Sequence, residues 1–150
     1  MNTNFKKIGL VLIATITLFS CTNNEEEIQT IAPENVAPVN GKLFSADEAQ
    51  NPITFRWTPV VPKPRDPIVY RLKVWQLMQG QNATQAMRSN QPIVTKDCDN
   101  ITETIVSGIY TGPCRPPYLC DFVWVVQALD KFGNPIGLNE GTSNPTVFNF

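Results

Sequence analysis

Several segments of this chain alternate between apolar and polar residues, and this alternation restricts its fold more than any other feature. The clearest runs are ITFRW at residues 53–57, VYRLKVWQLM at 69–78 and DFVWVVQALD at 121–130, with a shorter run, ITETIV, at 101–106. A last strand is expected to include residues 147–150. Side chains along a strand point alternately to its two faces, so β-branched and aromatic residues at every second position indicate half-buried strands. The chain is therefore predicted to be all-β.

Alternate positions of the three longest runs predict the hydrophobic core. Burying one large apolar side chain completely contributes about 1.5–3 kcal/mol to folding, so these rows should dominate the stability of the domain. The expected core is Ile53, Phe55, Trp57, Tyr70, Leu72, Val74, Phe122, Trp124, Val126 and Ala128.

Only one interval has a helical pattern, GQNATQAMRSNQP at residues 80–92. Asn82 or Thr84 provides a side chain suited to capping one or two helical turns at residues 83–88, and Pro92 ends them. The residues LDKFGNPIG at 129–137 contain the turn formers needed for a hairpin between the last two strands.

About seven short strands separated by turn signals indicate an antiparallel sandwich. The runs ITFRWTPV, YRLKVWQL, FVWVVQALDKFGNPIG and GTSNPTVFNF, in this order, resemble a fibronectin type III-like domain of the kind found in Bacteroidota surface and secreted proteins. This resemblance implies that Trp57 is the buried tryptophan of the second strand and that Tyr70 and Leu72 face it. The expected fold class is an all-β, antiparallel immunoglobulin/fibronectin III-like sandwich of about seven strands with one short helical excursion.

The N-terminus has the pattern of an export signal. Lys6 and Lys7 precede an apolar stretch at residues 8–19, which as a helix spans roughly 18 Å and is too short for a hydrocarbon core of roughly 30 Å. A basic start and a short apolar region are typical of a secretory signal peptide. The sequence LFSC at residues 18–21 resembles a bacterial lipobox, which implies that Cys21 is acylated and becomes the first mature residue. The alternative is an ordinary signal peptide with an incidental cysteine.

Three segments follow from these patterns. Residues 1–20 are predicted to be a lipoprotein signal peptide, residues 21–35 a lipidated cysteine and flexible acidic stalk, and residues 36–150 the fibronectin type III-like domain. The stalk contains too few large apolar groups to offset its chain entropy. Its acidic run, Glu25–Glu27, resembles the surface-export signal of Bacteroidota lipoproteins. We therefore expect lipid anchoring in the outer membrane at the cell surface, with a periplasm-facing position as the alternative.

The charge of the mature chain argues against a nucleic-acid partner. Without residues 1–20 the chain has ten basic and thirteen acidic side chains, a net charge near −3, and no cluster of Lys or Arg. Nucleic-acid binding depends on basic patches that release counterions. The residues after the stalk are enough for one domain with one core.

The side-chain chemistry gives no indication of an enzyme. The chain contains no histidine, which excludes Ser-His-Asp and Cys-His catalysis and imidazole metal sites. Paired carboxylates can hydrolyse glycosides, but a domain this small gives no sign of the deep cleft that holds such a pair. Asp97 and Asp99 lack the turn glycine and the downstream acidic ligand of a calcium loop. We expect no catalytic residues, no cofactor and no bound metal.

Three cysteines remain after the anchor, Cys98, Cys114 and Cys120. The compartments outside the cytoplasm permit disulfides, but three thiols cannot all pair within one chain. In GPCRPPYLC at residues 112–120, prolines restrict the backbone, and a candidate disulfide from Cys114 to Cys120 closes a short loop. The alternatives are a bridge from Cys98 to one of these two, or three reduced thiols. A zinc site is not indicated, because the set lacks a fourth ligand.

A candidate interaction face lies on the outer side of the predicted sheet. In a fibronectin type III-like domain the third, sixth and seventh strands share a sheet, and an exposed apolar surface rimmed by cations is typical of docking sites. The alternative is that the helix around residues 83–87 folds over this face and buries it. The face comprises Arg71, Lys73, Trp75, Leu77, Val123 and Val125.

Together these features predict a lipid-anchored envelope module rather than an enzyme. Its expected partners are the membrane, through the lipid, and another envelope protein bound by the sandwich surface. The alternative is a surface glycan-binding lipoprotein, for which Trp75 is the one plausible aromatic platform.

Overall fold

The computed structural model describes residues 29–109, 114 and 117–150, so the predicted signal peptide, Cys21 and most of the predicted stalk lie outside the described residues. Among the residues described, no helix is long and apolar enough to cross a membrane. The described chain forms one α-helix, two short 3₁₀ turns and eight strands. In order they are β1 (Asn35–Ala37), β2 (Lys42–Leu43), η1 (Glu48–Gln50), β3 (Ile53–Trp57), β4 (Val69–Met78), α1 (Ala83–Ser89), β5 (Val94–Asp99), β6 (Glu103–Val106), β7 (Tyr118–Leu129), η2 (Asn139–Gly141) and β8 (Thr146–Asn149).

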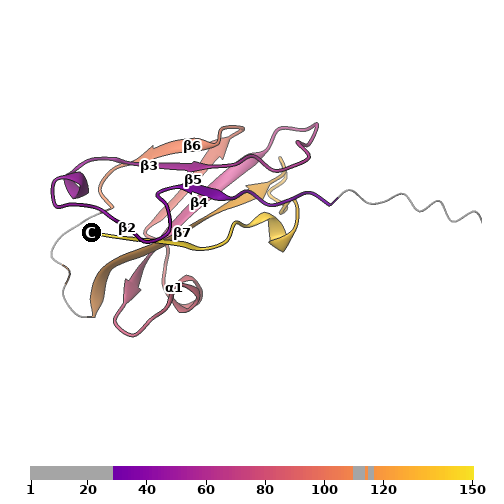
Figure 1. The fold of residues 1–150 in the computed structure, drawn as a ribbon. Coiled ribbons are helices and arrows are strands. Elements are labelled where there is room, and N and C mark those ends of the chain that lie inside the picture. The colour runs from indigo at the N-terminus through magenta and orange to yellow at the C-terminus, as the bar shows by residue number, and fades with distance from the viewer. Residues whose placement is uncertain (1–28, 110–113, 115–116) are drawn as a thin grey trace, which may run out of the picture.

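The strands form two sheets, as Figure 1 shows. One sheet has the order β1-β3-β6, and the other has the order β2-β8-β7-β4-β5. Neighbouring strands are antiparallel, except that β2 pairs with β8 in parallel. The prediction of a mostly β chain with one short helix is confirmed, and five of the strands follow the predicted runs. The structure adds β1, β2 and β5, which the alternation did not predict.

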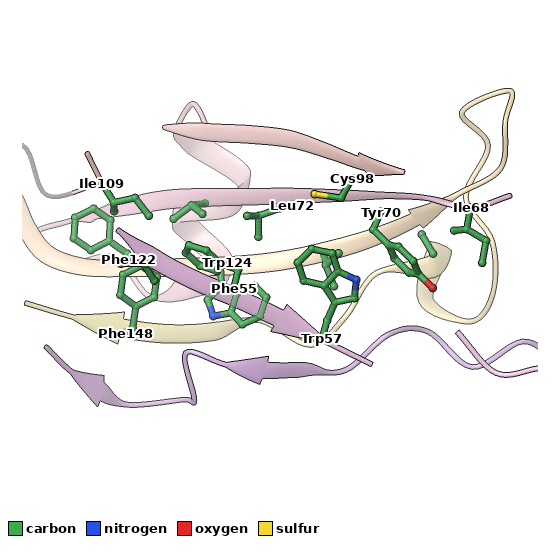
Figure 2. Packing of buried hydrophobic residues seen from close by; sticks show 14 of the residues in the cluster. Phe55, Trp57, Ile68, Tyr70, Leu72, Cys98, Ile109, Phe122, Trp124 and Phe148 are labelled. Carbon is green, nitrogen blue, oxygen red and sulfur yellow. The ribbon is translucent and has the colours of Figure 1, made fainter. Parts of the chain in front are cut away.

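The main core lies between the two sheets, and all ten predicted core residues are buried in it. Side chains of β3 from the smaller sheet contact side chains of β4, β7 and β8 from the larger one (Figure 2). The ring centroids of Phe55 and Trp124 are 5.1 Å apart, and those of Trp57 and Tyr70 are 5.8 Å apart. The hydroxyl of Tyr70 accepts a hydrogen bond from the Val60 amide at 3.2 Å, which satisfies a polar atom inside the core. We call the fifteen buried residues of this core the inner cluster: Ile53, Phe55, Trp57, Val60, Ile68, Tyr70, Leu72, Val74, Cys98, Ile109, Phe122, Trp124, Val126, Ala128 and Phe148.

The folded part of the chain begins earlier than the sequence predicted. Ile31 pairs with Val61 through hydrogen bonds of 2.6 and 3.3 Å, and Pro33 is fully buried. The side-chain amide of Asn35 donates to the Trp124 carbonyl at 3.2 Å and to Thr146 Oγ1 at 2.9 Å. The prediction of a flexible stalk up to Asn35 is therefore wrong for residues 30–35, because contacts with distant strands fix this segment.

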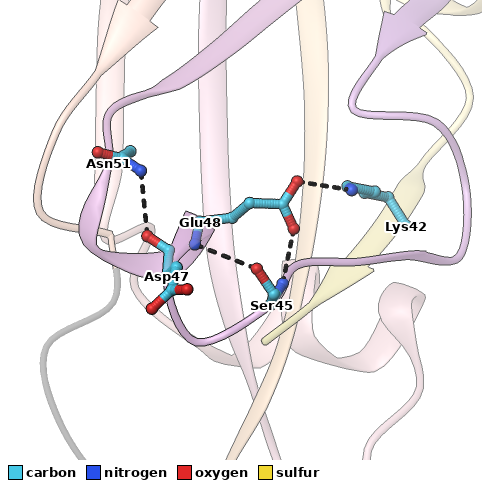
Figure 3. Close-up of polar contacts among 5 residues, drawn as sticks. All are labelled: Lys42, Ser45, Asp47, Glu48 and Asn51. Carbon is cyan, nitrogen blue, oxygen red and sulfur yellow. Dashed lines mark hydrogen bonds and ion pairs between the residues drawn. The ribbon is translucent and has the colours of Figure 1, made fainter.

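The connection between β2 and β3 is closed by polar contacts around η1 (Figure 3). The Glu48 carboxylate accepts from the Ser45 amide at 2.7 Å and from Lys42 Nζ at 3.1 Å. These hydrogen bonds, that of the Ser45 amide above all, lower the pKa of Glu48. The Asn51 side chain donates to the Asp47 carbonyl at 3.0 Å. These contacts fold a short surface segment onto itself beside the C-terminal strand.

The connection from β7 to β8 is longer than the predicted hairpin. The expected turn does form, because Asp130 Oδ1 accepts from the amides of Phe132 and Asn134 at 2.8 Å each. The turn pairs Leu129 with Pro135, however, and the chain then makes a second turn, η2, before β8 begins. The chain at the end of this second turn pairs with β7 through Thr142 and Gln127, and the turn forms one wall of the site described next.

Candidate functional site

The predicted interaction face is not a free surface. Trp75 and Leu77 of β4 are each 6% exposed, and Val123 and Val125 of β7 are 0% and 3% exposed. They pack with Ala86 of α1, which is completely buried, in a second apolar cluster that we call the outer cluster. The prediction that these side chains are available for docking is wrong. The alternative prediction, a helix folded over the face, is confirmed.

Local hydrogen bonds explain why α1 forms where it does. Asn82 Oδ1 accepts from the Gln85 amide at 2.9 Å, while Gln85 Oε1 accepts from the Asn82 amide at 2.9 Å. This reciprocal capping box satisfies donors that a helix start leaves unpaired. Ala83, Ala86 and Met87 then occupy the helix face that packs on the sheet.

Two amide side chains tie the ends of the helical excursion to β4. The Asn90 side chain donates to the Gln76 carbonyl at 2.8 Å and to Gln81 Oε1 at 2.8 Å. Gln81 Oε1 also accepts from the Met78 amide at 3.0 Å. The helix is therefore held by polar bonds at its flanks as well as by the apolar contacts beneath it.

The two cations of the predicted face differ in their contacts. Arg71 donates to both carboxylate oxygens of Asp97 on β5, at 2.7 and 2.9 Å. The hydrogen bond from Arg71 is the main cause of the lowered pKa of Asp97. Lys73 is half-buried on the same strand. Arg71 thus links β4 to the edge strand β5, and the Asp97 carboxylate is paired with Arg71 rather than open to a ligand.

A cleft of about 570 Å³ opens between α1 and the loop that follows η2. Three of the lining side chains come from α1, and the others come from η2 and the loop after it. Most of the lining residues are of polar types, with hydroxyls, side-chain amides and one charge of each sign, although apolar atoms contribute more than half of the lining surface. It comprises Thr84, Met87, Arg88, Asn139, Glu140, Thr142, Ser143, Asn144 and Pro145. We call it the helix–turn cleft.

The loop wall contains three consecutive residues in left-handed conformation. Asn139 and Glu140 each have φ of 53°, and Gly141 has φ of 67°. Left-handed backbone is unfavourable by roughly 1–2 kcal/mol per residue for most residue types. A Cβ at Gly141 would lie 2.5 Å from the Ile136 carbonyl oxygen and 2.7 Å from the Ala128 carbonyl oxygen, so glycine is required there. Such backbone strain is concentrated at functional sites in proteins.

The strained turn is fixed by the strand beside it. The Ser143 hydroxyl accepts from the Val126 amide at 2.9 Å, and the Ser143 amide donates to the Val126 carbonyl at 2.9 Å. The Gln127 side chain donates to the Glu140 carbonyl at 3.1 Å. The loop wall is therefore attached to β7, while the helix wall is attached to β4.

Arg88 and Glu140 give the cleft its charges. Both side chains are exposed, and neither takes part in an ion pair within the part of the chain that the structure describes. A cation and a carboxylate that remain open to solvent at the two walls of one cleft can recognise a polar ligand carrying both kinds of group. The sequence analysis missed this site because its walls are brought together only by the fold.

The cysteines are arranged as one of the predicted alternatives. Cys114 and Cys120 form a disulfide with their Cα atoms 5.3 Å apart. Cys98 on β5 is a buried free thiol of the inner cluster, and burial raises its pKa. Across residues 29–109, 114 and 117–150 there is no group of three or more His, Cys, Asp or Glu side chains placed to hold a metal ion.

Comparisons with protein-family models, with curated proteins and with solved structures find no match for this chain.

Proposed function

We propose that the protein is a lipid-anchored module of the outer membrane whose domain binds another envelope protein at the helix–turn cleft. The single observation that carries the binding role is the cleft itself. It lies between the left-handed turn, which is hydrogen-bonded to β7, and the capped helix α1, and Arg88 and Glu140 are open to a ligand there. No histidine is present in the chain, so binding rather than catalysis is the function that the side chains support best.

The proposed fold type is a fibronectin type III-like sandwich. The sheet orders β1-β3-β6 and β8-β7-β4-β5 support it, since the third, sixth and seventh strands of the predicted set share one sheet. The N-terminal segment divides between the two sheets, with β1 in one and β2 in the other. At the β8 side of the larger sheet the edge strand is β2, which has only two residues. A very short edge strand offers little unpaired backbone to another chain.

The proposed anchor is the acylated Cys21. The sequence LFSC at residues 18–21, after a short apolar stretch, supports it. Two or more acyl chains hold a protein stably on a membrane, at about 0.8 kcal/mol per buried methylene. The mass of the N-terminal peptide tests it: the wild-type peptide should begin at Cys21 and carry the mass of the acyl chains, and the Cys21→Ser variant should lack that mass. A wild-type N-terminal peptide whose Cys21 has the mass of an unmodified residue would contradict acylation.

Site-specific photo-crosslinking tests the binding role. A photoreactive amino acid is placed at Thr84, on the helix wall of the cleft, in the full-length protein expressed in its own membrane. The matched control carries it at Thr54, an exposed position on the outer side of the smaller sheet. We expect a discrete adduct from position 84 only, and its loss when Arg88 and Glu140 are both replaced by alanine. The same adducts from both positions, or none from either, would refute the cleft as a protein-binding site.

A glycan is the second candidate ligand. The amides, hydroxyls and carboxylate of the cleft favour it, because sugars are held by such groups. The buried position of Trp75 removes the aromatic platform that the sequence offered. A glycan array distinguishes the two candidates. Sugar binding that disappears in the Glu140→Ala variant would show that the ligand of the cleft is a glycan rather than a protein.

A further inference from the structure

Exposed apolar and basic side chains gather at the end of the domain where the described chain begins. Phe132, in the turn after β7, is 77% exposed, the largest exposed fraction among the large apolar side chains described. Ile31 and Val61 are each 54% exposed. Cations lie on the same segments. We call this set of six residues the tip: Ile31, Val61, Lys63, Arg65, Lys131 and Phe132.

Backbone hydrogen bonds and one ion pair connect the three segments of the tip. The amide of Ile31 donates to the Val61 carbonyl at 2.6 Å, and Val61 donates back at 3.3 Å. Lys131 Nζ lies 3.9 Å from Asp66 Oδ2, which joins the turn after β7 to the loop before β4. In Figure 1 the loop between β3 and β4 lies at the right-hand end, where the described chain starts, away from the C-terminus. The tip is therefore one surface at one end of the domain.

The loops of the tip are stiff. Four prolines, at positions 59, 62, 64 and 67, occur between β3 and β4, and each fixes its own φ. The turn that presents Phe132 is closed by Asp130, whose carboxylate accepts from the Phe132 and Asn134 amides. A surface that is already ordered loses little conformational entropy on binding.

The charges of the tip favour a negatively charged partner. Asp66 is paired with Lys131, and Asp130 keeps its negative charge while its carboxylate is hydrogen-bonded within its own turn, so the three cations of these segments outnumber the two carboxylates. Lys63 and Arg65 have no ion-pair partner among the residues that the structure describes. Two unpaired cations therefore stand beside three exposed apolar side chains.

We propose that the tip contacts the bilayer that holds the anchor, with Phe132 entering the interface and Lys63 and Arg65 facing anionic headgroups. This inference rests on the proposed acylation of Cys21. Seven residues lie between Cys21 and Gln29, so the eight Cα-to-Cα steps from one to the other span at most about 28 Å. The fold begins at the tip, so this end of the domain stays within that distance of the acyl chains.

Such a tether makes a weak contact effective. A short linker gives the attached surface an effective concentration in the millimolar range. Aromatic and aliphatic groups suit the boundary between headgroups and acyl chains, and cations are attracted to anionic lipid. A tip whose membrane affinity is too weak to recruit an untethered domain is therefore sufficient to orient a tethered one. This orientation directs the C-terminal end of the domain away from the membrane.

Fluorescence quenching by brominated lipid tests the contact. The full-length acylated protein is reconstituted into phosphatidylethanolamine–phosphatidylglycerol vesicles whose acyl chains carry bromine. The test variant is Phe132→Trp and the matched control is Tyr118→Trp, since Tyr118 is half exposed at the opposite end of β7. The native Trp57, Trp75 and Trp124 are buried and supply the same background in both variants.

We expect the indole at position 132 to lose emission and shift to the blue in brominated vesicles, while the indole at position 118 does not. Replacing Lys63 and Arg65 with serine in the Phe132→Trp variant should reduce this quenching. Equal quenching at positions 132 and 118, in protein that floats with the vesicles, overturns the tip contact alone. Protein that fails to float, and whose Cys21 has the mass of an unmodified residue, overturns the proposed anchor and this inference with it.

Discussion

The two faces of the larger sheet are both apolar, but they are covered in different ways. The cluster between the inner face and the second sheet contains fifteen buried residues, and the cluster between the outer face and the seven-residue α1 contains five. Both clusters use alternate residues of the same strands, β4 and β7. Period-two alternation shows which side chains share a face, whereas the element that covers a face is decided elsewhere in the chain.

The largest expected effect is the loss of stability when one tryptophan of either cluster is replaced by alanine. Trp57→Ala, in the inner cluster, should lower the free energy of unfolding by about 3–5 kcal/mol through lost burial and a residual cavity. Trp75→Ala, in the outer cluster, should cost less, toward the lower end of that range or below it, because a short helix can move into the cavity more easily than a sheet can. Urea unfolding of the two variants measures the difference. A larger loss for Trp75→Ala would reverse the comparison.

Undocking the helix should expose the outer face alone. Ala86 is completely buried between α1 and the sheet, so Ala86→Glu places a charge where no room exists. We expect a loss of about 1–3 kcal/mol and increased binding of a hydrophobic dye, while the inner cluster stays folded. The control is Ser89→Glu, at an exposed position of the same helix. Dye binding equal in the two variants would mean that α1 does not cover the face.

Removing the helix cap should weaken the outer cover without touching its apolar contacts. Asn82→Ala deletes the acceptor for the Gln85 amide and should cost about 1 kcal/mol. Amide hydrogen exchange within α1 should become faster, while exchange in β4 and β7 stays slow. Ser89→Ala, which removes no capping bond, is the matched control. Unchanged exchange in the Asn82→Ala helix would show that the capping box does not hold α1.

The smallest expected effect concerns the ion pair at the sheet edge. Arg71 and Asp97 are both partly exposed, so Asp97→Asn should cost only about 0.2–1 kcal/mol at neutral pH. Arg71 lowers the pKa of Asp97 in the folded state. The contribution of the pair is therefore present above the unfolded-state pKa of Asp97 and is lost as the pH falls through the folded-state pKa.

Unfolding midpoints of the wild type and the Asp97→Asn variant, measured from neutral to acidic pH, check this sign. The two midpoints should converge as the solution becomes acidic. A gap that stays constant down to strongly acidic pH would show that the asparagine acts through packing rather than charge.

Much of the inner cluster could be predicted from sequence, because it depends only on which residues alternate. Trp57, Tyr70 and Trp124 all lie where the alternation placed them. The start of α1 was also predictable, since Asn82 and Gln85 lie at the spacing of a capping box. Local pattern and local geometry agree in these regions.

The remaining features depend on contacts between distant residues. Residues 30–35 have the composition of a linker, yet Asn35 bonds to Trp124 and Thr146, more than eighty residues away. The exposure of Trp75 depended on where α1 folds, which no local pattern of β4 records. The left-handed turn has favourable residues in Asn139 and Gly141, but Glu140 gives no sign of it. The helix–turn cleft joins α1 to that turn and was therefore invisible in the sequence.

Hydroxyl-radical footprinting of the folded protein, read by mass spectrometry, tests the covered outer face most directly. We predict that Trp57, Trp75 and Trp124 are all protected, because each is at most 6% exposed, while the 77% exposed Phe132 is oxidised. Trp75 oxidised as fast as Phe132 in protein that keeps Trp57 protected would contradict the account, because the outer face would then be open.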